Sequence, residues 1–290
     1  MTDRLLICTD LDRTLIPNGS QPESGDARGR FGQLALRPEV CLVYVSGRHR
    51  ELVEEAIVSW QLPIPDFVIG DVGTTIYRVG STREWRHLDF WEQQIAEDWG
   101  AYSHDDLQRL LADVPALEPQ EASRQNRFKL SYNVPIDQDT GDLSGQVRQR
   151  LDAAGVRSRL IWSVDDSEGV GLLDVIPEQA SKRHAIEALM EHEGYSREET
   201  VFCGDSGNDL EVLISPIPSV LVANSQDEVK RLALRLAAEG GTQQQLYISK
   251  GDFLGMNGNY SAGMLEGIAH YHPDIIGWLV DPFESDIRSV

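Results

Sequence analysis

Residues 5–14 read LLICTDLDRT, and this stretch decides the fold. Its first half, Leu5 to Thr9, is a short apolar run of the kind that forms a strand buried on both faces of a parallel sheet. The chain then turns polar at once, with Asp10 and Asp12 two residues apart. In an open parallel sheet, ligands bind beyond the carboxyl ends of the strands. The stretch therefore predicts a buried strand that delivers two carboxylates to the functional edge of a sheet.

Other apolar runs predict further strands of the same sheet. They are CLVYVS (41–46), DFVIG (66–70), TVFCG (200–204) and SVLVA (219–223). Helical patterns alternate with them at 50–60 and 181–194, and the second has Ser181 as its N-cap and Gly194 as its C′ glycine. This alternation predicts an α/β fold with a doubly wound, Rossmann-like parallel sheet.

The middle third of the chain has a different pattern. Its segments are, in order, WRHLDFWEQQIAEDWG, a helical stretch at 104–113, the alternating run RFKLSYNV at 127–134, a helix at 143–154 and RSRLIWSV at 157–164. Alternation is typical of an antiparallel sheet with one solvated face. We therefore predict a core formed by 1–80 and 172–290, with a smaller α+β domain inserted at 81–171.

Composition excludes several classes of function. The 290 residues carry a formal charge of −21, which repels nucleic-acid backbones. The cysteines, at 8, 41 and 203, are odd in number and widely spaced, which argues against a disulfide framework or a zinc site. The first residues become acidic too soon for a signal peptide, and no apolar run is long enough to span a membrane. We expect a cytoplasmic protein.

Polar residues follow three more predicted elements. Ser46, Gly47 and Arg48 lie at the carboxyl end of the strand at 41–46, Lys182 opens a helix after the run GLLDVIP, and GDSGND occupies 204–209. A hydroxyl and backbone N–H groups before a helix suit a phosphoryl oxygen, and clustered acidic oxygens suit Mg²⁺.

Each feature alone has a plainer explanation. Asp12, Ser46, Asn208 or Asp209 could cap a turn or helix, and Lys182 could be a surface lysine. Their joint position at one sheet edge is what indicates a site. Clustered carboxylates about 4 Å apart repel by roughly 4 kcal/mol per pair near a protein surface, and a divalent cation together with Lys182 would relieve that cost.

These segments resemble the haloacid-dehalogenase-like (HAD) phosphatase superfamily through DLDRT (10–14), SGR (46–48), Lys182 and GDSGND (204–209). The insertion lies where that family carries its C2-type cap. The resemblance implies that Asp10 is the nucleophile, that Asp12 is the general acid/base, and that Asn208 and Asp209 support Lys182 and the metal shell. We expect the phosphate and neighbouring acids to raise the pKa of Asp12.

The resemblance also implies two sets of ligands. The phosphoryl group would be held by Thr14, Ser46, Gly47 and Lys182. The Mg²⁺ would be bound by the Asp10 carboxylate, the Asp12 backbone carbonyl and Asp205.

Within the superfamily the chain is most similar to the sucrose-6-phosphate phosphatases and related glycoside-phosphate phosphatases. The segments concerned are 65–77, 124–134, 172–182 and 257–271. This similarity implies a small phosphorylated sugar as substrate and a sucrose-phosphate synthase-type enzyme as a partner. The candidate substrate contacts at the hinge and in the cap are Arg48, Gly73, Thr74, Gln125, Lys129 and Ser131. An ordinary solvated strand face remains the alternative for Lys129 and Ser131.

The chain departs from the family pattern in two places. Arg183 stands where glycine is common after the lysine, and Arg13 stands where a small or amide residue is common. The polar, Gly/Pro-rich stretch 17–30 is predicted to be a mobile loop.

Other functions remain open at this stage. One is a phosphatase for another glycoside phosphate, such as mannosylfructose phosphate, and another is a non-catalytic sugar-phosphate-binding regulator. Asp10, Asp12, Lys182 and Asp205 argue against the regulator, because binding needs no nucleophile. A receiver domain would lack the long insert, and a dehalogenase would not need Asp12.

Overall fold

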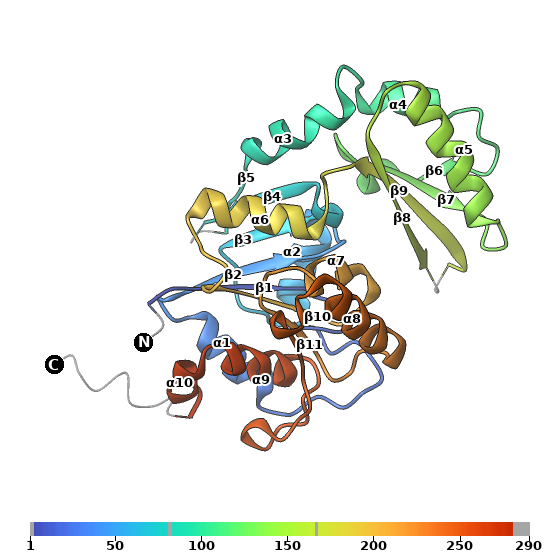
Figure 1. Cartoon of the computed structure of the whole chain (residues 1–290). Helices are drawn as coiled ribbons and strands as arrows, with labels where there is room; N and C mark the ends of the chain where they lie inside the picture. Colours follow the sequence, from blue (N-terminus) through green and yellow to red (C-terminus); the bar gives the residue numbers. More distant parts are fainter. Residues whose placement is uncertain (1–2, 81–82, 166–167, 281–290) are drawn as a thin grey trace.

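A computed structural model describes residues 3–80, 83–165 and 168–280. It contains a large lobe and a smaller one, each built around its own sheet (Figure 1). The large sheet has eight strands in the order β12-β11-β10-β1-β2-β3-β4-β5. They are β1 (Leu5–Thr9), β2 (Val40–Val45), β3 (Phe67–Gly70), β4 (Thr75–Val79), β5 (Trp85–His87), β10 (Thr200–Gly204), β11 (Ser219–Leu221) and β12 (Leu246–Ile248).

The strands from β12 to β3 run parallel, and β4 and β5 are antiparallel additions at one edge. Helices cover both faces. They are α1 (Ala27–Ala35), α2 (Arg50–Ser59), α6 (Lys182–Glu193), α7 (Leu210–Leu213), α8 (Asp227–Gly240), α9 (Ser261–Tyr271) and α10 (Ile276–Val280). Side chains of β1 alternate between the faces: Leu5 and Ile7 pack with α1, α2 and α9, whereas Leu6 and Cys8 pack with α6 and α7. The predicted doubly wound α/β fold is confirmed.

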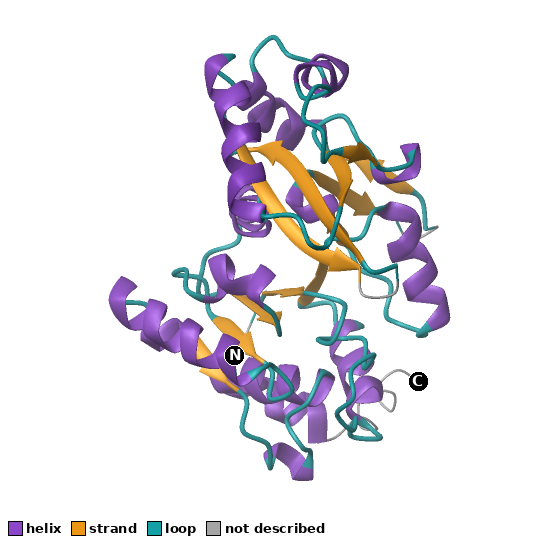
Figure 2. Ribbon diagram, turned by 90° about the vertical axis from the view of Figure 1, so that its right-hand side faces the viewer, coloured by secondary structure: helices purple, strands orange, loops and turns teal. Residues whose placement is uncertain are grey.

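The small lobe has an antiparallel sheet in the order β6-β7-β9-β8 (Figure 2). Its elements are α3 (Asp89–Trp99), α4 (His104–Leu110), β6 (Glu118–Pro119), β7 (Leu130–Val134), α5 (Thr140–Ala153), β8 (Ser158–Asp165) and β9 (Val170–Pro177). One face of this sheet packs its apolar side chains, such as Leu130, Tyr132 and Val175, into a core cluster that continues into the large lobe. The opposite face is left for the cleft between the lobes.

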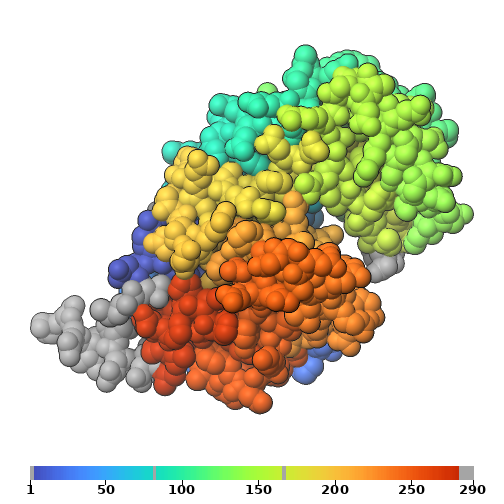
Figure 3. All heavy atoms as spheres, viewed as in Figure 1, coloured from blue at the N-terminus to red at the C-terminus, as the bar shows by residue number. Residues whose placement is uncertain are grey.

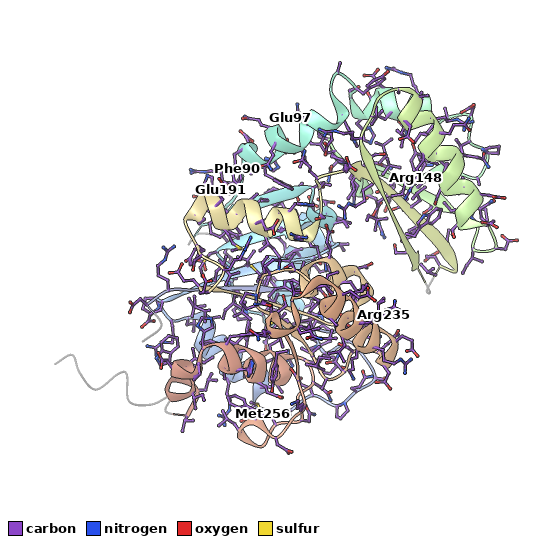
Figure 4. The ribbon with its side chains drawn as sticks, in the orientation of Figure 1. Phe90, Glu97, Arg148, Glu191, Arg235 and Met256 are labelled. Atoms are coloured by element: carbon purple, nitrogen blue, oxygen red, sulfur yellow. The ribbon has the colours of Figure 1, made fainter. Side chains whose placement is uncertain are left out.

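Short 3₁₀ turns complete the chain. They are η1 (Asp71–Gly73), η2 (Ala122–Arg124), η3 (Gly207–Asp209), η4 (Gln243–Gln245), η5 (Phe253–Gly255) and η6 (Pro273–Ile275). Phe90 of α3, labelled in Figure 4, stacks on His192 of α6 with ring centroids 4.2 Å apart. Within the described ranges, no helix combines the length and the apolar character that crossing a bilayer requires.

Local sequence signals explain the element that positions the lysine. Ser181 caps α6 through its side chain, which accepts a hydrogen bond from the His184 N–H, and Gly194 ends the helix in the left-handed conformation at φ 71°. Both predicted caps are confirmed. The helix therefore begins at Lys182, close to the sheet edge where β1 and β10 end.

The stretch 17–30 differs from the predicted mobile loop. Its second part forms the start of α1, and its first part is tied to the C-terminal segment. Asn257 and Asn259 each donate a side-chain hydrogen bond to the Pro22 carbonyl, and the Tyr260 hydroxyl donates to the Gln21 carbonyl. Composition indicated a loop correctly, but partners more than 200 residues away in sequence fix its position.

Candidate active site

The polar segments meet because their strands are neighbours in the sheet. Strand β1 lies between β10 and β2, so Asp10, Ser46 and Asp205 emerge from adjacent parallel strands at the same edge. Lys182 reaches this edge from the first turn of α6. A cleft of about 420 Å³ opens above the edge and is bounded by both lobes. In the space-filling view the green small lobe leans over the orange surface of the large one (Figure 3).

A cluster of buried acids forms the floor of the cleft. Carboxylate oxygens of Asp10, Asp205 and Asp209 lie within 4.8 Å of one another. The Lys182 ammonium donates to Asp10 Oδ1 at 2.9 Å and to Asp209 Oδ1 at 2.7 Å. Asp209 Oδ2 accepts from the backbone N–H groups of Asp205 and Ser206. Both oxygens of Asp209 thus accept hydrogen bonds from the protein, and the residue holds Lys182 and the loop.

Gly204 makes this arrangement sterically possible. A Cβ at that position would lie 2.6 Å from Asp209 Oδ2, which is far below a van der Waals contact. The glycine at the end of β10 therefore lets the Asp209 carboxylate fold back under the loop. The close approach of the Asp209 carboxylate therefore explains why the GDSGND segment begins with a glycine.

Burial sets the charges of the cluster. Desolvation, opposed by Lys182 and reinforced by Asp209, raises the pKa of Asp10 to about 8. Desolvation together with Asp209 likewise raises the pKa of Asp205 to about 7, although Arg13 and Lys182 oppose it. For Lys182 burial acts the other way, but Asp10 and Asp209 outweigh it and raise the pKa above its ordinary value. The lysine is therefore firmly cationic beneath crowded acids.

These residues fit a magnesium ion. Both oxygens of Asp209 already accept hydrogen bonds from the protein, whereas Asp10 Oδ2 and the Asp205 carboxylate accept none from the described residues, so Asp10 and Asp205, both almost fully buried, are the acids best placed to bind a cation. An all-oxygen donor set with few protein ligands suits Mg²⁺, which keeps several of its waters. A nearby cation would also favour the ionised forms of the two acids whose pKa values burial raises. Asn208 is exposed on the rim of the same cleft.

Asp12 departs from the predicted behaviour. Burial would raise the pKa of its carboxyl group, but hydrogen bonds and charge from Arg48, with a further bond from Asn18, outweigh burial and lower it. Arg48 donates two hydrogen bonds to the carboxylate in a bidentate contact, from Nη2 to Oδ1 at 2.6 Å and from Nε to Oδ2 at 2.8 Å. In the protein without substrate the pKa of Asp12 is therefore lowered, because the guanidinium from the neighbouring strand end, which the expectation did not include, outweighs burial.

The predicted phosphate ligands fall into two groups. Ser46 and Gly47 line the cleft, and the Ser46 hydroxyl accepts a bond from the Arg48 N–H. Ser46 does not cap α2, whose N-cap is His49. Thr14 lies fully buried below the cleft, and its hydroxyl has no hydrogen-bond partner within the described chain.

The small lobe contributes the opposite wall, which we call the cap wall. Its members are Gln120, Arg124, Lys129, Ser131, Ile161, Ser163, Leu172 and Asp174. Ser131, Asp174 and Ile161 are direct cross-strand partners on β7, β9 and β8 and so share one face. The Ser131 hydroxyl donates to Asp174 Oδ1 at 2.5 Å. Burial raises the pKa of Asp174, although Lys129 and Ser131 oppose that effect.

Lys129 has a second role at the junction of the lobes. Its ammonium lies 3.0 Å from Asp71 Oδ1, and both side chains are at least nine-tenths buried. Asn126 of the small lobe also donates to Thr74 Oγ1 across the junction. Two contacts therefore join the small lobe to η1 and to Thr74, the residue that follows it.

Within the described part of the chain, three of the predicted substrate contacts do not line the cleft: Gly73, Thr74 and Gln125. Gly73 has φ 94°, and a Cβ there would meet the Ser181 backbone at 2.4 Å, so it serves close packing of η1 on α6. The Gln125 amide is used inside the small lobe, where Oε1 accepts from the Ser131 N–H and Nε2 donates to the Ser131 carbonyl.

Sequence reasoning missed several cleft residues. Asp174 was detectable, because an acid interrupts the otherwise apolar run LLDVIP at 172–177. Gln120 follows the two-residue strand β6 and Arg124 ends the short turn η2, and neither segment has a sequence pattern that singles these residues out. Of the two departures from the family pattern, Arg183 pairs with Glu187 one turn further along α6, whereas Arg13 lines the cleft.

The chain is similar to several known proteins. Residues 3–272 match the family described as Sucrose-6F-phosphate phosphohydrolase. The protein named "Putative HAD-like hydrolase" in Nitrosococcus oceani is 48% identical over 279 residues, which is 96% of this chain and 75% of that protein. Sucrose-phosphatase 1 of Nicotiana tabacum is 29% identical over 93% of this chain, which spans only 59% of its length.

Two further relatives extend the comparison. Mannosylfructose-phosphate phosphatase of Agrobacterium fabrum is 29% identical over 79% of this chain and 86% of that protein. The sucrose-phosphatase of Synechocystis sp. PCC6803, solved in complex with sucrose and phosphate, covers 93% of this chain and 98% of its own, with a TM-score of 0.69 and 24% identity. At 24% identity, this structural similarity shows the fold alone.

Proposed function

The chain belongs to the sucrose-6F-phosphate phosphohydrolase family of HAD-type phosphatases, and from that premise we propose that it hydrolyses sucrose 6-phosphate to sucrose and phosphate. The observation that carries the proposal is the buried Asp10 carboxylate on the floor of the cleft, 2.9 Å from the Lys182 ammonium and facing the cap wall. A sucrose-phosphate synthase-type enzyme would supply the substrate.

The proposed reaction has two steps. An oxygen of Asp10 forms a bond to phosphorus as the bond from phosphorus to the sugar oxygen breaks, which leaves an aspartyl-phosphate. Water then attacks the phosphorus, and phosphate leaves as the Asp10 carboxylate is regenerated. Lys182 balances the charge of Asp10 and stays fixed by Asp209, so it is positioned before substrate arrives.

Asp12 is the proposed proton donor and acceptor. It must give a proton to the leaving sugar oxygen and later take one from water. Its bidentate contact with Arg48 holds it ionised in the present structure. Acid catalysis therefore requires Arg48 to release Asp12, and an incoming phosphoryl group is a competing partner for the guanidinium.

Mg²⁺ is the proposed cofactor, held by Asp10, the Asp12 carbonyl and Asp205, and when bound it supplies charge neutralisation for the phosphoryl group. The phosphoryl end would lie between Ser46, Gly47 and Lys182. The sugar end would then reach the cap wall, where Ser131 and Asp174 offer hydrogen-bond acceptors to hydroxyl groups.

A panel of substrates tests the proposal. Sucrose 6-phosphate, mannosylfructose phosphate, glucose 6-phosphate and p-nitrophenyl phosphate would be assayed with Mg²⁺ and with a chelator. We expect the highest kcat/KM for sucrose 6-phosphate and loss of turnover with the chelator. Turnover that the chelator leaves intact would remove the metal from the proposal.

A second substrate is favoured by one observation. The mannosylfructose-phosphate phosphatase of Agrobacterium fabrum has the same 29% identity to this chain as the tobacco sucrose-phosphatase, although over 79% of the chain instead of 93%. A preference for mannosylfructose phosphate would transfer the assignment to that substrate. Activity on p-nitrophenyl phosphate alone would leave a phosphatase without a disaccharide substrate.

A further inference from the structure

Arg13 is a cation of the cleft to which the proposed mechanism gives no role. Its Nε lies 3.2 Å from Asp205 Oδ2, within ion-pair distance. That Nε is buried yet makes no hydrogen bond with the described residues. The contact is therefore held by charge and lacks the directional bond that would make it difficult to replace.

The backbone of Arg13 is fixed in an unusual conformation. Its φ of 59° lies in the left-handed region, which is unfavourable for an arginine. Two asparagines hold it there: Asn18 Oδ1 accepts from the Arg13 N–H at 2.8 Å, and Asn224 Nδ2 donates to the Arg13 carbonyl at 2.7 Å. Strained residues that the surroundings hold in place cluster at functional sites.

Asp205 needs a counter-charge that Lys182 does not supply by contact. The ammonium of Lys182 bonds to Asp10 and Asp209. Asp205 is almost fully buried beside those two acids, and the ion pair that reaches it within the described chain comes from Arg13. Removing the guanidinium without supplying another cation would leave a buried carboxylate facing like charges.

We infer that Arg13 is a built-in counter-ion of Asp205 that competes with Mg²⁺ and so sets the metal affinity of the site. The inference rests on the proposed function, in which Asp205 is a metal ligand. Mg²⁺ and the guanidinium cannot both lie against this carboxylate without repelling each other, so metal binding displaces Arg13. The side chain is 37% exposed and lines the cleft, so it is not packed against protein on every side.

Titration calorimetry with MgCl₂ tests the competition without any assay of turnover. Arg13→Gln keeps the length of the stem and removes the charge, Arg13→Lys keeps a charge, and Arg124→Gln removes an arginine from the cap side of the same cleft. We expect Arg13→Gln to bind Mg²⁺ about fivefold more tightly than wild type, the upper end of what a partly exposed ion pair is worth. Arg124→Gln should match wild type, and Arg13→Lys should fall between wild type and Arg13→Gln.

Thermal unfolding of the same proteins gives the second sign of competition. In chelator, Arg13→Gln should unfold at a lower temperature than wild type, and Mg²⁺ should raise its Tm by more than it raises that of wild type. An equal or weaker Mg²⁺ affinity in Arg13→Gln would overturn the inference. If wild type binds Mg²⁺ and the variant binds no tighter, the proposed function stands and only this role for Arg13 is lost. If neither binds, both are lost.

A third readout follows the Arg13 side chain of the wild-type protein directly. In ¹⁵N spectra, the Nε–H signal of Arg13, assigned by its loss in Arg13→Lys, should be protected from exchange with water in chelator. Adding MgCl₂ should speed that exchange as the guanidinium leaves Asp205. Unchanged protection at saturating Mg²⁺ would show that Arg13 stays in place and would contradict the displacement.

Discussion

The floor of the cleft and its cap wall contain the same kinds of side chains, but the chain assembles them in different ways. On the floor, Asp10, Ser46 and Asp205 each come directly after a parallel strand, so the adjacency of β10, β1 and β2 brings these three residues together. On the cap wall, Ser131 and Asp174 meet only through the antiparallel register of β7 and β9. A shift of one residue in that register would turn either side chain to the other face.

The two regions therefore differ in what a substitution should do. The floor carries charges that the reaction uses, and these are already engaged by protein partners such as Lys182 and Arg48. The cap wall carries groups that hold either the sugar or the two lobes. Changes on the floor should affect every substrate, whereas changes on the cap wall should affect sugar phosphates selectively.

The largest effect is expected from Asp10→Asn. Without the nucleophile, kcat should fall about 10⁴-fold or more on every phosphate ester tested. The variant should unfold at a temperature no lower than wild type, because an amide relieves the crowding of acids around Asp205 and Asp209. Calorimetry alongside the rate assay would show this. Substantial residual turnover in a well-folded Asp10→Asn protein would exclude the proposed mechanism.

Asp12→Asn should affect substrates differently, according to whether their leaving group needs a proton. Loss of the proton donor should lower kcat/KM for sucrose 6-phosphate about 10²- to 10⁴-fold. The loss should be much smaller for p-nitrophenyl phosphate, because nitrophenolate leaves without a proton. Steady-state kcat/KM values for the two substrates measure the difference. An equal loss on both would show that Asp12 is needed for positioning and not for proton transfer.

Lys129→Met tests the junction that links the floor to the cap wall. It leaves the buried Asp71 carboxylate without its cation, which should cost about 3 to 5 kcal/mol in the free energy of unfolding. Adding Asp71→Asn should recover part of that loss. Urea denaturation measures both. As a control, Arg231→Met breaks an exposed pair with Glu228 and should cost well under about 1 kcal/mol; a similar cost for the two single variants would mean that the buried pair has no special weight.

The smallest effect is expected from Asp174→Asn on the cap wall. The amide preserves the size of the side chain but replaces a charged acceptor with a neutral one, which should raise KM for sucrose 6-phosphate about tenfold. KM for p-nitrophenyl phosphate should not change, and Asp137→Asn on the exposed surface of the same lobe should alter neither. A matching rise for p-nitrophenyl phosphate would place the defect in the fold of the small lobe and not in sugar binding.

The sequence predicted more of the residues on the floor than on the cap wall. An apolar strand followed by an acid is a local signal, and the strand neighbours follow from the rules for parallel sheets. Even so, the sequence did not reveal that Arg48 would hold Asp12 ionised. That contact spans 36 residues and depends on how two side chains turn at adjacent strand ends.

By itself, the sequence determined the doubly wound α/β core, the inserted α+β lobe and the acids that follow β1 and β10, because hydrophobic periodicity and strand-end chemistry are local properties of the chain. Only the tertiary structure decided that Lys129 pairs with Asp71, that Asp174 joins Ser131 on the cap wall, and that Arg13 lies against Asp205. Such contacts depend on strand register, on backbone conformations such as that of Arg13, and on the packing of the two lobes. None of these is encoded in any short segment.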